Sequence, residues 1–167
     1  VKTVTYAFLY GAGNEKLGLS YDNSLQPKKA SKKGSEIRKA FVAAIEGLSD
    51  LLAAVSNKAT NGWLMAIDGR RVLVDSPHKA LNYLLQCSAG IVAKRWMVIA
   101  DDGIKHHVHT HQLAFVHDEL QYETTPDGAE ILSSILEESA RLAGEYYNLR
   151  CPIAAESKTG LNWAEVH

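Results

Sequence analysis

Two neighbouring carboxylates, Asp118 and Glu119, stand in the middle of the apolar stretch AFVHDELQ, residues 114–121. A buried carboxylate is costly unless a cation or a hydrogen-bond donor pairs with it. Adjacent side chains of a regular strand point to opposite faces, but at a hairpin tip they can converge on one ion. Hard cations such as Mg²⁺ take oxygen ligands and keep waters or substrate phosphates in their shell. The pattern therefore fits a magnesium site for phosphate chemistry, or alternatively a hairpin turn with two solvated acids.

A second candidate lies in the helical stretch at residues 1–10. Lys2, Tyr6 and Tyr10 are four residues apart, so they share one face of the helix. A lysine with two tyrosines on one face suits a triphosphate and a stacked base. The alternative is an ordinary amphipathic helix whose aromatic residues belong to the core.

A third candidate is a polar stripe on an otherwise apolar helix. The Ser-Pro pair at 76–77 supplies an N-cap and a first-turn proline, which predicts a helix over residues 77–99. His78, Asn82 and Gln86 repeat every four residues along it. Such side chains can bond to the acceptors that every base pair shows in the minor groove. A plain solvent-facing stripe is the alternative.

Three histidines alternate in the segment HHVHTHQ. His107, His109 and His111 would share one face of a strand, where three imidazoles could bind Zn²⁺ or Ni²⁺. An exposed polar strand face is the alternative, because no fourth ligand is evident from the spacing.

Charge is balanced overall but not along the chain. The net charge is −1, which argues against a generic nucleic-acid binder. The stretch over residues 26–39 nevertheless concentrates basic side chains that could contact phosphates. These are Lys28, Lys29, Lys32, Lys33, Arg38 and Lys39, against the single acid Glu36. The alternative is a solvated helix start.

The remaining patterns predict an α+β fold, with helices packed on a small antiparallel sheet. Glycines interrupt the chain at residues 11–13, and Asp68-Gly69 predicts a hairpin. Helices are expected over 1–10, within 14–34, over 35–55, over 77–99 with ADDG (100–103) closing it, and from 126 to about 147; strands are expected on both sides of Asp68-Gly69 within 63–74, on both sides of His117-Asp118 within 106–124, and over 151–157.

The sequence has the features expected of an intracellular protein. The longest apolar runs fall short of membrane-spanning length, and no signal peptide is visible. The two cysteines, Cys87 and Cys151, lack CxxC spacing and are expected as reduced thiols. We therefore expect a cytoplasmic protein with no membrane partner.

Taken together, the motifs resemble family A (DNA polymerase I-type) DNA polymerases. KTVTYAFLYGAG (2–13) is similar to the second half of the motif B helix, and VHDELQ (116–121) is similar to motif C. DGRRV followed by SPHKALNYLLQ resembles the segment that joins fingers to palm, and TGLNWAEVH resembles the C-terminal tail. Order and spacing match over nearly the whole chain. The tyrosine at position 6 and the short finger segment resemble the phage replicative branch. If a phage encodes the protein, the resemblance implies the host cytoplasm as its location.

The resemblance implies an architecture. Residues 1–62 would be a helical fingers remnant, containing the end of the motif B helix and the helices after it. Residues 63–167 would be the palm portion, with a small antiparallel sheet whose hairpin carries motif C, packed by long helices.

The resemblance also implies roles in template-directed nucleotidyl transfer by two Mg²⁺ ions. Asp118 would be a ligand of the metal pair, with Glu119 beside it in a lesser role. His117 would contact the primer terminus. Lys2 would meet the phosphates of the incoming dNTP and could donate a proton to the pyrophosphate leaving group.

Five further residues would contact the nucleotide or the primer-template DNA. Tyr6 sits where the family discriminates sugar 3′-substituents, and a tyrosine there implies acceptance of dideoxynucleotides. Tyr10 would guard the insertion site beside the templating base. Asn82 and Gln86 would touch the duplex near the primer end. His78 stands one turn earlier, where many relatives have arginine.

One element of the family pattern has no match in these 167 residues. Motif A supplies a second aspartate that bridges both metals, and none of the other aspartates stands in its context. We therefore expect an incomplete polymerase piece, a split subunit or a fragment, that is inactive alone. A palm without the motif A strand has an open sheet edge, which predicts self-association or a companion polypeptide carrying motif A. The alternatives are a non-catalytic nucleic-acid-binding module and a metal-binding protein built on the histidine strand.

Overall fold

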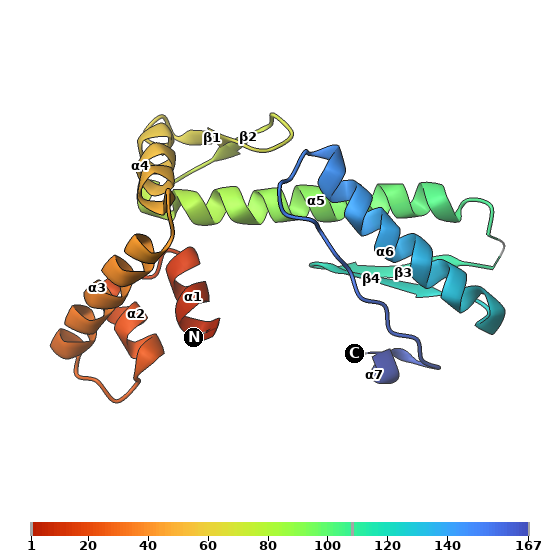
Figure 1. The fold of residues 1–167 in the computed structure, drawn as a ribbon, viewed down its shortest axis with the longest axis horizontal. Coiled ribbons are helices and arrows are strands. Elements are labelled where there is room, and N and C mark those ends of the chain that lie inside the picture. Colours follow the sequence, from red (N-terminus) through yellow and green to blue (C-terminus); the bar gives the residue numbers. More distant parts are fainter. Residues whose placement is uncertain (1, 108, 167) are drawn as a thin grey trace. The chain divides into compact units, whose positions relative to one another are not determined.

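A computed structural model describes residues 2–107 and 109–166 (Figure 1). The chain forms two compact units, residues 1–87 and 88–167, and the division falls within helix α5 (Ala80–Ile104). Helices dominate, and the strands form two separate two-stranded antiparallel sheets, so the predicted α+β class is confirmed. The predicted division into a fingers remnant (1–62) and a palm portion (63–167) is a functional one and stays a prediction.

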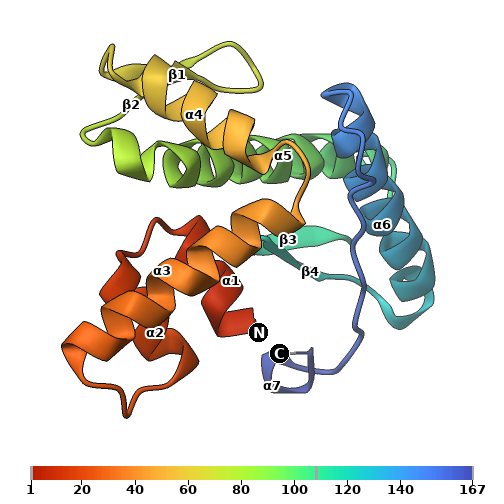
Figure 2. The same ribbon diagram turned by 60° about the vertical axis from the view of Figure 1, so that its left-hand side comes forward.

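The first unit begins with a run of helices, α1 to α4 (Figure 2). They are α1 (Lys2–Leu9), α2 (Asn14–Tyr21), α3 (Pro27–Ala44) and α4 (Leu48–Ala59). α2 and α3 cross with their backbones in contact. A Cβ added to Gly18 would lie 1.9 Å from the Ala30 carbonyl oxygen, and one added to Gly34 would lie 1.8 Å from the Asn14 carbonyl oxygen. Only glycine permits this approach, so the crossing is a close-packed joint.

The expected helix over 35–55 is wrong in its bounds. α3 already begins at Pro27, whose fixed φ and missing N–H suit the first helical position. α3 ends at Ala44, and Gly47 adopts φ 76° before α4 starts. The turn between them bends the chain by 107°. Apolar residues spaced by three or four continue through this bend, so periodicity alone does not reveal it.

Within residues 2–107 and 109–166, no single helix is long and apolar enough to cross a membrane, and the bent pair α3–α4 meets that criterion only by length and composition when taken together.

The helical part of the first unit is held by one apolar cluster. Phe8, Leu17 and Leu48 are buried at its centre. The rings of Phe8 and Phe41 lie 4.5 Å apart, centre to centre, and are tilted by 38°. α1 is thereby anchored to α3 through one side, which leaves its other side for contacts outside the core.

The predicted hairpin around Asp68-Gly69 is confirmed. β1 (Trp63–Met65) pairs with β2 (Arg71–Leu73), and Gly69 has φ 83° in the turn. Leu64 joins a second buried cluster with α4 and the start of α5. The chain then enters α5 through the 3₁₀ turn η1 (Pro77–Lys79), as the Ser-Pro pair predicts.

In the second unit, α5 is longer than expected. It runs through ADDG (100–103) to Ile104, because that stretch carries residues that the fold buries. Ala100 is 0 % exposed and Ile104 packs against Leu132. A Cβ on Gly103 would lie 2.8 Å from the Ile135 Cγ2 atom, so this glycine permits close helix packing and does not end the helix.

A hairpin and one long helix complete the second unit (Figure 1). They are β3 (His111–Val116), β4 (Glu119–Glu123), the 3₁₀ turn η2 (Pro126–Gly128) and α6 (Ala129–Tyr146). Leu120 and Tyr122 of β4 pack on the α5–α6 cluster. The Trp96 indole N–H donates to the Leu136 carbonyl at 2.7 Å and ties α5 to α6. The expected strand over 151–157 is wrong: the segment is extended but pairs with no strand among the described residues.

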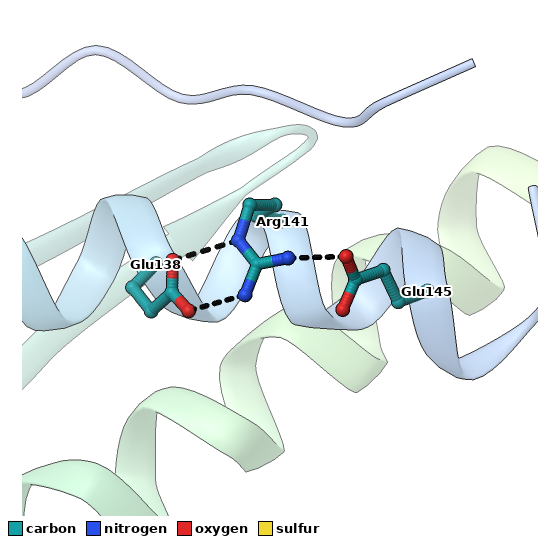
Figure 3. Close-up of polar contacts among 3 residues, drawn as sticks. All are labelled: Glu138, Arg141 and Glu145. Carbon is teal, nitrogen blue, oxygen red and sulfur yellow. Dashed lines mark hydrogen bonds and ion pairs between the residues drawn. The ribbon is translucent and has the colours of Figure 1, made fainter.

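The solvent side of α6 carries an ion-pair chain (Figure 3). The Arg141 guanidinium contacts Glu138 one turn before it and Glu145 one turn after it, with Nε donating to Glu138 Oε2 at 2.8 Å. This hydrogen bond, together with the positive charge, holds the pKa of Glu138 below its ordinary value. The segment after α6 is fastened by a bond from the Ser157 N–H to Glu137 and ends in α7 (Trp163–Val166).

Candidate nucleotide and nucleic-acid site

α1 presents the lysine–tyrosine face outward. Tyr6 is 50 % exposed and Tyr10 is 55 % exposed, whereas Phe8 on the opposite side is 3 % exposed. The Tyr6 and Tyr10 rings lie 6.4 Å apart, centre to centre. Lys2, at the first helical position, is also exposed. The alternative that these tyrosines belong to the core is therefore wrong, and the face is open to a ligand.

Arg38 of α3 holds the loop that follows this helix. Its guanidinium donates from Nε to Asn14 Oδ1 at 2.9 Å and from Nη2 to the Ala12 carbonyl oxygen. It also lies 5.4 Å from the centre of the Phe8 ring. The sequence grouped Arg38 with residues that could contact phosphates, but in the structure it clamps the end of α1 onto α2 and α3. The signal that separates it from the neighbouring lysines is its guanidinium, which can make two directed bonds at once.

The end of α1 lies beside η1. Gly11 has φ 71°, and a Cβ there would lie 3.2 Å from the carbonyl oxygen of His78. The structure therefore brings the Tyr10 end of the lysine–tyrosine face next to the start of the polar stripe, although Gly11 and His78 are 67 positions apart in sequence (78 − 11).

The polar stripe is partly pre-arranged by bonds that sequence reasoning missed. The Ser76 hydroxyl and the His78 Nδ1 atom lie 2.7 Å apart, so Ser76 bonds to the imidazole and makes no N-cap bond. The Gln86 amide donates to Asn82 Oδ1 at 2.9 Å. His78 and Gln86 are exposed and Asn82 is half-buried.

Contacts to Asp75 fix the backbone beside this stripe. The Tyr83 hydroxyl donates to Asp75 Oδ1 at 2.9 Å across eight residues, and Lys79 lies 3.8 Å from the same carboxylate. The bond raises the pKa of Tyr83 above its ordinary value of 10.0, because ionised Tyr83 would lose its donated proton and face the Asp75 charge. The segment that carries His78 is thereby tied at both ends.

The acidic pair lies at the tip of the β3–β4 hairpin, as predicted. Val116 pairs with Glu119, so His117 and Asp118 form a two-residue turn. His117 adopts φ 56°. A two-residue turn with positive φ at its first central position matches the right-handed twist of the two strands. His117 and Asp118 are both exposed, so the tip is accessible to a ligand.

The two carboxylates do not stand in equivalent places. Asp118 lies in the turn, whereas Glu119 is the first residue of β4, is half-buried and accepts a hydrogen bond from Gln121 two residues on. Carboxylate oxygens fit the ligand preference of Mg²⁺. Among residues 2–107 and 109–166, however, no group of three or more His, Cys, Asp or Glu side chains is placed to hold a metal ion, and the magnesium site stays a prediction.

The histidine strand is not formed. β3 starts at His111, while His107 lies before it and His109 adopts φ 71°, which breaks the alternation that a shared face requires. The residue between them, 108, lies outside the described residues. Among the described residues, the strand on which the metal-binding alternative depends is therefore not formed over His107 and His109.

Both the motifs and the fold are those of the polymerase class. The sequence profile of DNA polymerase family A matches residues 1–165, and the chain belongs to this family. The DNA-directed DNA polymerases of Enterobacteria phage T3 and Escherichia phage T7 are each 34 % identical to it over 183 aligned positions, covering 99 % of this chain and 26 % of the relative. The chain spans about a quarter of the length of these curated relatives.

Similarity extends to solved structures. The POL domain of Pol1 from M. smegmatis, in complex with DNA primer-template and dNTP, matches with a TM-score of 0.70 and 24 % identity. The match covers 85 % of this chain and 26 % of that one. At this identity the likeness shows a shared fold.

Proposed function

We propose that this chain supplies the nucleotide-binding helix and the acidic hairpin of a DNA-directed DNA polymerase. The observation that carries the proposal is the outward face of α1, where Lys2, Tyr6 and Tyr10 are exposed while Phe8 anchors the helix.

The α1 face binds the incoming nucleotide. Lys2 meets the phosphates, where a positioned cation lowers the cost of charge that develops during transfer, and it donates a proton to the leaving pyrophosphate. Tyr6 lies against the sugar, and Tyr10 stands at the templating base. Because Arg38 fastens the loop after α1, these side chains are held before the nucleotide arrives.

The hairpin tip binds the metal. Asp118 holds Mg²⁺ through its carboxylate, Glu119 supports it from β4, and His117 contacts the primer terminus. When bound, a pair of Mg²⁺ ions activates the primer 3′-hydroxyl and stabilises the leaving oxygens. The exposed position of Asp118 in the turn supports this role, since the bond to Gln121 already engages Glu119.

The stripe on η1 and α5 touches the DNA duplex. Asn82 and Gln86 direct amide groups to acceptors in the minor groove near the primer end, and His78 does so one turn earlier. The bonds from Ser76 to His78 and from Gln86 to Asn82 support this role, because they orient the side chains at little further cost on binding.

The chain does not complete the metal site. A second aspartate is needed to bridge the two ions, and it must come from a motif A segment that these 167 residues do not contain. Alone, the chain is inactive. Its β3–β4 sheet is two-stranded among the described residues, so its edges are open to a strand from a companion segment or a second copy.

Primer extension tests the proposal. The chain is assayed with Mg²⁺, primer-template and dNTPs, with and without a polypeptide that carries motif A. We expect extension only in the mixture, abolished by Asp118→Asn and retained by Asp127→Asn, a matched exposed aspartate in η2.

Three outcomes would count against parts of this proposal. Extension by the chain alone would contradict the missing-ligand argument. A mixture in which Asp118→Asn stays active would remove Asp118 from the metal site. Salt-dependent duplex binding with no extension in any mixture would favour the alternative of a non-catalytic nucleic-acid-binding module.

A further inference from the structure

A groove beside α3 combines lysines with an exposed aromatic ring. It has a volume of about 260 Å³ and lies between the end of α2, the turn after it and the first half of α3. Tyr21 and Leu25 line it from one side, and Lys29, Lys32 and Lys33 line it from α3. None of these residues belongs to the nucleotide face of α1, the acidic hairpin or the stripe on α5.

The lysines in the first turn of α3 do not stabilise that helix. The first turn of this helix contains no acidic residue, and Gln26 makes no side-chain cap bond. Lys28 and Lys29 stand in that turn, where the helix dipole disfavours positive charge. Across its length α3 carries six basic residues and one acid. Such a distribution weakens the isolated helix and concentrates positive potential beside the groove.

The acids that border the groove neutralise it only in part, because Asp22 and Glu36 stand against three lysines. Asp22 accepts bonds from the Ser24 N–H at 2.9 Å and from the Ser24 hydroxyl at 2.7 Å. Glu36 lies 3.6 Å from the Lys33 amine. Among the described residues, Lys29 and Lys32 form no ion pair with a carboxylate, so both can bind an anion.

The aromatic ring is placed to act as a platform. Tyr21 is 61 % exposed at the last position of α2. The Lys33 amine lies 5.2 Å from the centre of its ring, which steadies the ring beside the lysines. The backbone contact of Gly18 with Ala30 fixes α2 against α3, so the ring and the amines keep their spacing.

We infer that this α3 groove (Tyr21, Lys29, Lys32 and Lys33) binds single-stranded nucleic acid. A base stacks on Tyr21, and the adjoining phosphates meet the lysine amines. Single-strand sites combine these two features, an aromatic face for an unpaired base and a positive track for the backbone. An acidic peptide would use the lysines but not the ring, and a duplex keeps its base faces covered.

The inference goes beyond the proposed function, because it needs neither Mg²⁺ nor a nucleotide and uses none of the residues assigned there. For a polymerase, the unpaired part of a template is a ligand of this chemistry.

Fluorescence anisotropy of the full chain with a labelled 12-nucleotide single strand, in EDTA and without dNTP, tests the inference. We expect the single strand to bind more tightly than a duplex of the same length. Tyr21→Ala should weaken it roughly five- to a hundredfold, and Tyr21→Phe should restore it. The Lys29→Ala/Lys32→Ala pair should lower the slope of log affinity against log salt by about 1.4.

The matched control is Lys39→Ala, an exposed lysine of α3 that does not line the groove, and it should change affinity much less. Equal losses for Lys39→Ala and Tyr21→Ala would overturn the inference in favour of diffuse charge attraction. If a polyglutamate peptide competes as effectively as unlabelled single strand, the inference is overturned in favour of an acidic partner.

Photocrosslinking of an iodouridine-containing strand gives an independent check. Crosslinks to the peptide that contains Tyr21 support the groove, and crosslinks confined to α1 or α5 refute it. Primer extension remains a separate assay, so failure here leaves the polymerase proposal standing.

Discussion

Arg38 Nε donates a hydrogen bond to Asn14 Oδ1 at 2.9 Å, joining residues 24 positions apart. The same guanidinium bonds to the Ala12 carbonyl and lies over the Phe8 ring, so one side chain joins α1, the loop after it, α2 and α3. The exposed tyrosines of α1 owe their placement to this clamp as much as to their own spacing.

Arg38→Ala should destabilise the first unit. Hydrogen bonds from a charged donor contribute about 1.5–3 kcal/mol, and the variant also leaves the Ala12 carbonyl without its partner. We expect a loss in that range by urea unfolding, with faster hydrogen exchange at the amides of α2 than in the wild type. Arg150→Ala, an exposed arginine after α6, is the matched control and should unfold like the wild type. Unchanged exchange in α2 would show that the clamp does not hold the loop.

Gly34→Ala should disrupt the crossing of α2 and α3. The new Cβ would lie 1.8 Å from the Asn14 carbonyl oxygen, so the two helices must separate. Overpacking of this kind typically costs about 1–3 kcal/mol or more. Gly90→Ala in α5 is the control, because nothing lies within 4 Å of its Cβ position. By helix propensity that variant should be stabilised by up to about 1 kcal/mol. Thermal melts that rank the two variants in the opposite order would contradict the close contact.

Glu138 should make the chain sensitive to acid. Arg141 lowers the pKa of Glu138 below its ordinary value of 4.5, so the ionised form is favoured in the folded state. The resulting stability is present above that ordinary value and is lost as pH falls through the lowered folded value. We expect Glu138→Gln to reduce the difference in melting temperature between pH 7 and acid pH. If the melting temperature of Glu138→Gln depends on pH in the same way as that of the wild type, the ion pair between Glu138 and Arg141 adds no stability.

Tyr83 should make the stability of the folded chain sensitive to alkaline pH. Its bond to Asp75 raises the pKa of Tyr83, so the protonated hydroxyl is favoured in the folded state. This stability is present below the ordinary value of 10.0 and is lost as pH rises through the raised folded value. Tyr83→Phe should flatten the alkaline part of the stability profile. Tyrosine ionisation can be followed by absorbance in the wild type and in Tyr83→Phe. If the wild type shows no hydroxyl that ionises above the ordinary value and is missing from the variant, the hydrogen bond from Tyr83 to Asp75 is contradicted.

Ser76→Ala should weaken duplex binding if His78 touches the DNA. Loss of the hydroxyl at 2.7 Å from Nδ1 frees the imidazole to change tautomer and rotamer. We expect several-fold weaker binding of primer-template in anisotropy titrations, with Ser76→Thr close to wild type because it keeps the hydroxyl. The ¹⁵N shifts of His78 should change in Ser76→Ala, and equal shifts in both chains would show that Ser76 does not set the tautomer.

Local patterns sufficed wherever the deciding forces were local. The four-residue spacing of Lys2, Tyr6 and Tyr10 places them on one helix face in any surroundings, and Asp68-Gly69 sets its hairpin by turn geometry. The order HDE between two apolar strands likewise predicts the acidic tip. The family follows from these motifs because their order along the chain is a property of sequence. The roles of the site residues remain predictions, since the ligands they would contact lie outside the chain.

Tertiary contacts decided the rest. ADDG reads as a helix end, yet burial of Ala100 and Ile104 against α6 carries α5 through it. Periodicity continues through Gly47, but the backbone turns there. The start of α4 shares the apolar cluster of α3, and the end of α4 packs in a second cluster with β1 and the start of α5. Arg38 shares its charge with the neighbouring lysines, and only the positions of Asn14 and Ala12 in the fold turn its guanidinium into a clamp. Residues 151–157 have strand composition but no strand to pair with among the described residues. In each case the outcome depends on residues far away in the chain, and a pattern read along the sequence does not contain that information.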